Sequence, residues 1–254
     1  MSAAVETVLS LLFPPRCAVC GRPIRQQTYV CESCKAELAR ITAPYCPFCG
    51  MNTADCTCRK QPHAYSQVIA PFYYEGGVRQ MLLALKYGGR QEGAVFLAEE
   101  LKRELSARLF GCSFDLMTCI PTTRERIAER GYNQAESIAA CIKADPKTGF
   151  LQGTERDFRL LRKNRTDSMQ HFLGASGRRA NIRNAFSIRP EKSVEGKRIL
   201  LVDDIVTTGS TAEECSEILR LCGAEEVVVA CAALTRRKNA EPGTSLQETE
   251  KVLS

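Results

Sequence analysis

Two adjacent carboxylates, Asp203 and Asp204, stand at the end of an apolar stretch of this chain. Paired carboxylate oxygens accept hydrogen bonds from neighbouring hydroxyl groups and also bind Mg²⁺. The 2′ and 3′ hydroxyls of a ribose are therefore suitable ligands for this pair, either directly or through a magnesium shell.

The residues that follow the carboxylates are small and rich in hydroxyl groups: Thr207, Thr208, Gly209, Ser210 and Thr211. Periodic apolar residues from Ala212 to Cys222 predict a helix directly after them. Hydroxyl and free N–H groups at the start of a helix bind phosphate, and a glycine lets the backbone come close to the ligand. The segment Ile199–Thr211 thus predicts a site for a phosphorylated ribose, and the alternative is an ordinary strand–loop–helix corner.

Eight of the fourteen cysteines lie between Cys17 and Cys58, mostly as Cys-x-x-Cys pairs. In a chain without an export signal such pairs favour metal sites over disulfides, and two pairs supply the four thiolates of a tetrahedral zinc site. We expect two structural zinc ions bound in sequence order, by Cys17, Cys20, Cys31 and Cys34, then by Cys46, Cys49, Cys56 and Cys58. A cross-braced grouping and an iron–sulfur cluster are the alternatives. The six single cysteines are expected to be buried thiols.

A basic segment precedes the apolar stretch that carries the carboxylates. Between Arg156 and Arg189, nine Lys and Arg residues stand against two acidic ones, a local charge of +7 in a chain whose net charge is +6. Such a segment suits a phosphate-rich partner, either a diphosphate ligand or a nucleic acid, and a solvated surface is the simplest alternative. Candidate cations are Arg162, Lys163 and Arg165.

The elements that must position these residues alternate between strand and helix. Apolar residues at helical spacing predict helices around 78–85 and 97–109. Short apolar or β-branched runs predict strands at 114–120, 197–202 and 225–234. This alternation predicts an α/β fold with a parallel sheet flanked by helices, which binds its ligands at the carboxyl ends of the strands.

The composition is that of an ordinary globular protein, with 254 residues of which 44% are hydrophobic and 25% charged. Apolar residues between Val5 and Leu12 predict a short amphipathic helix rather than a signal peptide, and no apolar run is long enough to span a membrane. We therefore expect a cytoplasmic protein with this helix and a double zinc ribbon at 1–64, the α/β domain at 65–235 and a disordered tail at 236–254.

The segment Ile199–Thr211 closely resembles the signature of type I phosphoribosyltransferases, which use 5-phosphoribosyl diphosphate. The surrounding sequence is similar to the ComF family (ComFC/GntX-like) through LKYGG at Leu85–Gly89, IPTTRERIAERGYNQA at Ile120–Ala135 and the run from Arg162 through Phe186. The likeness implies a type I phosphoribosyltransferase-like sheet behind an N-terminal double zinc ribbon.

The resemblance also implies roles for individual residues. The turn after the first core strand would contact the diphosphate, and this turn contains Pro121, Thr122, Thr123 and Arg124. The basic segment resembles a loop that closes over the active site, where Arg162, Lys163 and Arg165 would neutralise the leaving diphosphate. Mg²⁺ would bridge the diphosphate oxygens, and Asp203 and Asp204 would stabilise the cationic state that forms at the anomeric carbon.

One position departs from the pattern of the enzymes that salvage purine bases. Those enzymes carry an aspartate where this chain has Thr207, and a threonine does not act as a general base at neutral pH. Purine-base salvage is therefore disfavoured, and the acceptor is left open. Binding of the sugar phosphate is better supported than any particular transfer.

Two functions follow from the resemblance. The first is a phosphoribosyltransferase, a glycosyltransferase that moves a pentosyl group, acting with Mg²⁺ in DNA uptake (competence) or in nucleotide metabolism. The second is a non-catalytic protein of DNA uptake or processing that binds single-stranded DNA beside DNA-uptake proteins. In that case the basic segment and aromatic residues of the cysteine-rich head, such as Tyr29 and Tyr45, would contact the strand. A scaffold protein with a vestigial loop is a third alternative.

Overall fold

The computed structural model of the protein describes residues 14–25, 28–58, 60–88, 91–164 and 185–236. The helix expected between Val5 and Leu12, the candidate cation Arg165 and the tail from 237 onward lie outside the described residues.

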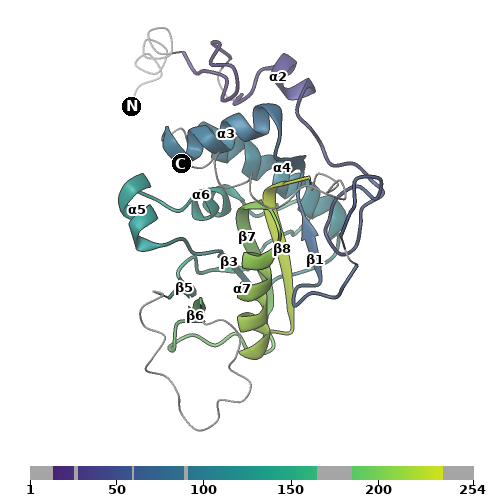
Figure 1. Ribbon diagram of the computed structural model, residues 1–254, viewed down its shortest axis with the longest axis vertical. Coiled ribbons are helices and arrows are strands. Elements are labelled where there is room, and N and C mark those ends of the chain that lie inside the picture. Colours follow the sequence, from purple (N-terminus) through teal and green to yellow (C-terminus); the bar gives the residue numbers. More distant parts are fainter. Residues whose placement is uncertain (1–13, 26–27, 59, 89–90, 165–184, 237–254) are drawn as a thin grey trace, which may run out of the picture.

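A six-stranded sheet forms the centre of the larger domain (Figure 1). Its strands run in the order β1 (Gln67–Ile69), β8 (Glu226–Leu234), β7 (Arg198–Val206), β3 (Leu116–Cys119) and β4 (Glu155–Arg156), and β2 (Phe72–Tyr73) pairs with the end of β8. Every pair in this sheet is parallel. The predicted α/β fold with a parallel sheet is therefore confirmed, and the carboxyl ends of β3, β7 and β8 lie at one edge.

Helices cover both faces of the sheet (Figure 1). On one face lie α3 (Gly76–Tyr87), α4 (Glu92–Arg108) and α6 (Gln134–Cys141), and on the other lies α7 (Ser210–Leu221). Because successive strand residues point to opposite faces, Val202 packs with the first group and Leu201 with α7. The sheet is thus buried on both sides, which explains why β7 and β8 read as continuous apolar runs.

A short helix and a pair of short strands lie near the β3–β4 side of the sheet. Helix α5 (Arg124–Arg130) follows the end of β3, and no periodic apolar pattern had indicated it. Strands β5 (Leu161–Lys163) and β6 (Phe186–Ile188) form an antiparallel pair, so the chain on both sides of 165–184 is held together. The basic segment is therefore anchored at its two ends.

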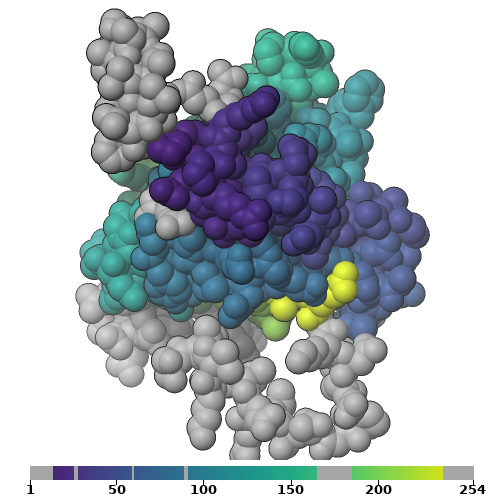
Figure 2. Space-filling model, turned by 90° about the horizontal axis from the view of Figure 1, so that it is seen from above, coloured from purple at the N-terminus to yellow at the C-terminus, as the bar shows by residue number. Residues whose placement is uncertain are grey.

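The cysteine-rich head lies on the larger domain in two places. Residues 16–25 and 28–38, which contain the short helix α2 (Glu32–Ala36) and are called the first ribbon below, pack across α3 (Figure 2). A Cβ atom at Gly77 of α3 would lie 3.0 Å from side-chain atoms of both Val19 and Leu38, so the contact is close. Residues 44–58, the second ribbon, pack instead beside β1 and α7, where Met51 joins the core on the α7 face.

The single cysteines follow the prediction only in part. Cys119, Cys215 and Cys231 are buried, whereas Cys112 and Cys141 are half-buried. Cys222 is exposed, which corrects the expectation of a buried thiol there. The reason is that α7 ends at Leu221, so Cys222 leaves the helical face that buries Cys215.

Within the described residues, no helix is both long and apolar enough to cross a membrane.

Candidate functional site

Strand β7 carries the carboxylate pair, and it runs further than the sequence indicated. The apolar run ends at Val202, but β7 pairs with β8 as far as Val206 opposite Leu234, so both carboxylates belong to the strand. Each is half-buried, and each accepts a hydrogen bond from the next backbone N–H, from Asp204 N at 2.9 Å and from Ile205 N at 2.8 Å. These bonds fix both side chains at the carboxyl edge of the sheet.

Burial, followed by the neighbouring charge of Asp204, raises the pKa of Asp203 well above its ordinary value. Two adjacent carboxylates in a desolvated position repel each other, so the pair gains from a cation or from hydroxyl donors placed between its oxygens. The donor set fits Mg²⁺, which prefers oxygen ligands.

The loop after β7, Thr207–Thr211, is called the phosphoribosyl loop below. Gly209 is the N-cap of α7 with φ of 84°, a left-handed conformation that favours glycine. The Thr208 and Ser210 hydroxyls lie 2.9 Å apart, and the loop encloses a cavity of about 30 Å³ together with Asp203. The structure thus brings the predicted carboxylate and the predicted phosphate-binding residues to one cavity at the start of a helix.

The turn after β3, Pro121–Arg124, is called the diphosphate turn below. Ile120 N donates to Val202 O at 2.9 Å, which puts this turn directly beside the carboxylate pair. Asn133 supports it, because its buried Nδ2 donates to Ile120 O at 2.9 Å. Thr123 caps α5 by accepting a hydrogen bond from Arg126 N at 3.3 Å. The sequence prediction had not singled out Asn133, although it lies inside the block that carries the family resemblance.

A groove of about 980 Å³ begins at the diphosphate turn and is called the basic groove below. Its cationic lining residues are Arg124, Arg159, Arg162, Lys163 and Arg189. Arg162 and Lys163 extend from β5 and are exposed. Two regions far apart in the sequence, the diphosphate turn and the basic segment, therefore meet in one groove. The groove and the cavity of the phosphoribosyl loop have no lining residue in common.

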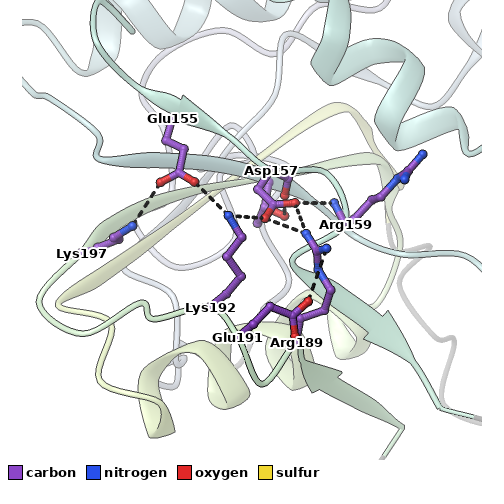
Figure 3. A network of polar contacts seen from close by, with 8 residues as sticks. Glu155, Asp157, Arg159, Arg189, Glu191, Lys192 and Lys197 are labelled. Carbon is purple, nitrogen blue, oxygen red and sulfur yellow. Dashed lines mark hydrogen bonds and ion pairs between the residues drawn. The ribbon is translucent and has the colours of Figure 1, made fainter.

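Not every cation of the basic segment is available to a ligand. Arg189 donates to both oxygens of Asp157 at 2.8 Å, and Lys192 lies 3.3 Å from the same carboxylate and from Glu155 (Figure 3). Burial alone would raise the pKa of Asp157, but the N–H of Arg159 and the two cations hold it below its ordinary value. This network fastens the β5–β6 pair to β4, so that Arg162 and Lys163 extend into the groove from a fixed support, with the Lys163 ammonium 5.4 Å from the centroid of the Phe186 ring.

The eight cysteines of the head form two clusters of four, in each of which the sulfur atoms lie within 4.8 Å of one another. The clusters contain Cys17, Cys20, Cys31 and Cys34, and Cys46, Cys49, Cys56 and Cys58. This is the sequential grouping. The Cys20–Cys31 and Cys46–Cys58 sulfur distances are 3.8 and 3.7 Å. Tetrahedral zinc with Zn–S bonds of about 2.3 Å places its sulfurs about 3.8 Å apart, so zinc fits both clusters.

Hydrogen bonds prepare some of the thiols for metal, whereas burial raises the pKa of Cys34, Cys49 and Cys58. The hydroxyl of Ser33, 3.3 Å from the sulfur of Cys31, lowers the pKa of this thiol to about 6. Burial would raise the pKa of Cys46, but backbone N–H groups of its own knuckle lower it to about 7. A thiolate is the form that coordinates zinc. With four protein ligands to each ion there is no open position, so the role of the zinc is structural.

The aromatic residues of the head are less available than the sequence indicated. The guanidinium of Arg108 lies over the ring of Tyr45, 4.0 Å from its centroid, and Tyr45 OH donates to Glu104 at 3.4 Å. Tyr45 is therefore engaged with α4 and not free to stack on a nucleic acid base. Tyr29 packs against the core on the α3 face.

Sequence reasoning also missed the residues that connect the head to the phosphoribosyl loop. Glu213 in the first turn of α7 accepts a hydrogen bond from Ala64 N and lies 2.9 Å from His63 Nδ1, while the rings of His63 and Tyr65 stack. His63 and Ala64 thus join the segment after the head to the first turn of α7. No motif could have indicated the contact, because it joins positions 149 and 150 residues apart.

Comparison with known protein families agrees with the two modules. A model of the double zinc ribbon domain matches residues 8–65, and a model of the phosphoribosyl transferase domain matches residues 127–250. The fold and the site therefore define a protein with a phosphoribosyltransferase domain behind a double zinc ribbon.

Relatives named as DNA utilization proteins and competence proteins match along most of the chain. The DNA utilization protein YhgH of Salmonella typhimurium is 31% identical over 222 residues, 86% of this chain and 90% of that protein. Competence protein F of Haemophilus influenzae is 26% identical over 79% of this chain and 88% of its own length, and competence protein ComFC of Bacillus subtilis is 24% identical over 72% and 74%. The chain belongs to the ComF family.

Proposed function

We propose that this chain binds 5-phosphoribosyl diphosphate together with Mg²⁺ and transfers its phosphoribosyl group to an acceptor. The observation that carries the proposal is the juxtaposition, at one edge of a parallel sheet, of the carboxylates Asp203 and Asp204, the phosphoribosyl loop and the diphosphate turn. Each provides the chemistry for one part of the ligand, namely the ribose hydroxyls, the 5-phosphate and the diphosphate.

The roles follow from the chemistry of each group. Asp203 and Asp204 accept hydrogen bonds from the ribose hydroxyls, and their charge stabilises the cationic character that develops at the anomeric carbon. Thr208, Ser210 and the first N–H groups of α7 bind the 5-phosphate. The diphosphate turn, with Arg162 and Lys163 from β5, neutralises the leaving diphosphate. Asp203 and Asp204 would hold Mg²⁺, which when bound would supply Lewis-acid assistance to departure of the leaving group.

Calorimetric titration of the zinc-loaded chain with 5-phosphoribosyl diphosphate and Mg²⁺ tests the proposal. Replacing both carboxylates, Asp203→Asn with Asp204→Asn, is expected to weaken binding about tenfold or more, because each loses its charge-assisted hydrogen bonds. The matched control is Asp145→Asn, an aspartate that lines none of the cavities described above. Absent binding, or equal binding by the double variant and the control, would contradict the proposal.

The basic groove supports a second candidate function, binding of single-stranded DNA in DNA uptake or processing. Five cations line this groove, and relatives of the chain bear the names DNA utilization protein and competence protein. A phosphate backbone laid along such cations displaces counterions, so its affinity falls steeply with salt. The two functions are compatible, because a phosphoribosyl unit is itself part of a nucleotide.

Binding of a labelled oligonucleotide, measured over a series of salt concentrations, tests this second candidate. Arg162→Ala and Lys163→Ala are each expected to reduce the slope of log affinity against log salt by about one. Lys147→Ala, which removes an exposed cation outside the groove, is the control. A shallow salt dependence, or equal slopes in all three variants, would count against a strand in this groove.

A further inference from the structure

A second cavity touches the phosphoribosyl loop from the side opposite the diphosphate turn. It measures about 310 Å³ and lies between the second ribbon and the loop, and is called the ribbon cavity below. Val206, Thr207, Thr208 and Gly209 line both this cavity and the small cavity of the phosphoribosyl loop. A molecule in the ribbon cavity would therefore lie against the loop that binds the sugar phosphate.

The strand order gives the two sides of the site different roles. The diphosphate turn follows β3 on one side of β7, whereas the ribbon cavity is lined by Val68 of β1 and Leu234 of β8 on the other. If a ribose binds at the end of β7, its leaving diphosphate would point towards β3, and the ribbon cavity would lie on the other side of the ribose, towards β8. Displacement at the anomeric carbon requires the acceptor on the face opposite the leaving group, and this arrangement provides it.

The apolar and aromatic walls of the ribbon cavity suit an aromatic ring that carries no phosphate group. Met51, Val68 and Leu234 are apolar, and Tyr65, stacked on His63, contributes an aromatic wall. Within the described part of the chain the Tyr65 hydroxyl has no hydrogen-bond partner, and it lies close to Gly209. Apolar walls with a few polar groups, here Gln61, Thr207 and the Tyr65 hydroxyl, are typical of a site for a small organic ligand.

The charge around the ribbon cavity favours a ring that becomes positive. None of its described lining residues is Lys or Arg, while the zinc-binding thiolates Cys49 and Cys58 belong to its wall. Four thiolates around one Zn²⁺ leave a net negative charge, which disfavours a phosphate and favours a cation. Glu213, bound to His63 and Ala64, adds a further carboxylate nearby.

We propose that the ribbon cavity holds the acceptor, and that the acceptor is an uncharged aromatic heterocycle with a pyridine-type nitrogen. The inference rests on the phosphoribosyltransferase function proposed above. Thr207 offers no base, and a pyridine-type nitrogen needs none because it carries a free lone pair. That lone pair forms the bond to the anomeric carbon, the bond from this carbon to the diphosphate oxygen breaks, and its electron pair leaves with the diphosphate. No proton moves, and the ring takes a positive charge beside the thiolates.

The second ribbon is fixed firmly enough to serve as a wall of this site. A Cβ atom at Gly50 would lie 2.2 Å from the backbone oxygen of Val68, so the knuckle of the ribbon touches β1 directly. Tyr73 OH donates to Asp55 at 2.5 Å, and Arg236 lies over the ring of Tyr73. These contacts join the second ribbon to the ends of β2 and β8.

Calorimetry on the full zinc-loaded chain tests the acceptor, with benzimidazole and nicotinamide as probes and uracil, which has only N–H ring nitrogens, as the comparison. Titrations are made with 5-phosphoribosyl diphosphate and Mg²⁺ present, and release of diphosphate is measured in parallel. We expect one or both pyridine-type probes to bind and to release diphosphate, and uracil to do neither.

Thr57→Trp fills the exposed rim of the cavity and should weaken binding of the probe roughly tenfold while the affinity for 5-phosphoribosyl diphosphate is unchanged. Thr53→Trp, at an exposed position of the same ribbon outside the cavity, is the control and should change neither. Tyr65→Phe keeps the aromatic ring but removes the unpaired hydroxyl, and it should weaken binding of the probe about fivefold.

The outcomes separate this inference from the function on which it rests. If 5-phosphoribosyl diphosphate binds but no probe does, or if Thr57→Trp and Thr53→Trp behave alike, the acceptor site is overturned and the proposed function stands. If a probe binds and Thr57→Trp alone weakens it, but 5-phosphoribosyl diphosphate does not bind, the cavity is a heterocycle site and the proposed function fails.

Discussion

The two zinc ribbons have the same ligands but different neighbours. The first lies on α3, on the face of the sheet away from α7, and contacts none of the cavities that contain the phosphoribosyl loop. The second lies beside β1 and α7, and its cysteines Cys49 and Cys58 line the ribbon cavity together with Thr207 and Gly209. Equal coordination chemistry therefore gives one module that stabilises the fold and one that also shapes a site.

Loss of a zinc ligand should produce the largest difference in effect between the two ribbons. Cys17→Ser and Cys46→Ser are each expected to reduce the zinc content from two ions to one and to destabilise the chain, because binding of structural zinc drives folding of the ribbon. Only Cys46→Ser should also weaken the binding of 5-phosphoribosyl diphosphate, by about tenfold, since the phosphoribosyl loop then loses its contact with the second ribbon. Zinc content is measured by mass spectrometry and affinity by calorimetry. Equal affinities in both variants would remove the distinction.

The knuckle glycines give the next largest difference. Gly21 and Gly50 both have positive φ, 72° and 75°, but a Cβ at Gly21 meets nothing within 4 Å whereas one at Gly50 strikes the oxygen of Val68. Gly21→Ala should cost about 1–2 kcal/mol of unfolding free energy from backbone strain alone. Gly50→Ala should cost at least about 3 kcal/mol, because the clash adds to that strain. Denaturant unfolding of the zinc-loaded variants measures both, and similar losses would mean that the second ribbon is not held tightly.

Two contacts that hold the cysteine-rich head, one between the ribbons and one at the second ribbon, should respond to pH in opposite directions, with the smallest effects. The buried Glu100 of α4 holds Arg40, between the ribbons, at 2.8 Å. Burial would raise the pKa of Glu100, but Arg40 and Arg103 hold it below its ordinary value. Its contribution to stability is therefore present above the unfolded pKa of about 4.3 and is lost as the pH falls through the lower folded value.

Tyr73, which anchors the second ribbon, titrates on the alkaline side. Burial, followed by its hydrogen bond to Asp55, raises its pKa to about 12. Its contribution is present below the unfolded value of about 10 and is lost as the pH rises through about 12. Unfolding free energies compared with those of Glu100→Gln and Tyr73→Phe isolate the two contributions, each about 1–2 kcal/mol. The difference in unfolding free energy between the wild type and Glu100→Gln should change at acidic pH, and that between the wild type and Tyr73→Phe should change at alkaline pH. A difference that stays constant over these pH ranges would contradict the prediction.

The sequence indicated the fold and the residues of the candidate site through local patterns. Strand and helix periods placed β7, β8, α3, α4 and α7, and the order of acidic, hydroxyl and glycine residues at 203–211 indicated the ligand chemistry. The end of β7 was misplaced because pairing with Leu234 of β8, not local polarity, extends the strand to Val206. Cys222 and Tyr45 were misjudged for a related reason, since a helix end and a neighbouring guanidinium decide their exposure and availability.

The sequence by itself determined the residues that can do chemistry, the eight thiols and the carboxylate–hydroxyl loop, because their types and spacing are local properties of the chain. Only the tertiary structure decided which of them meet. The groove shared by Pro121 and Arg162 and the ribbon cavity between Cys58 and Thr207 both depend on contacts between distant segments. Such contacts arise from strand order and from close packing, as at Gly50 against Val68, which no short motif contains.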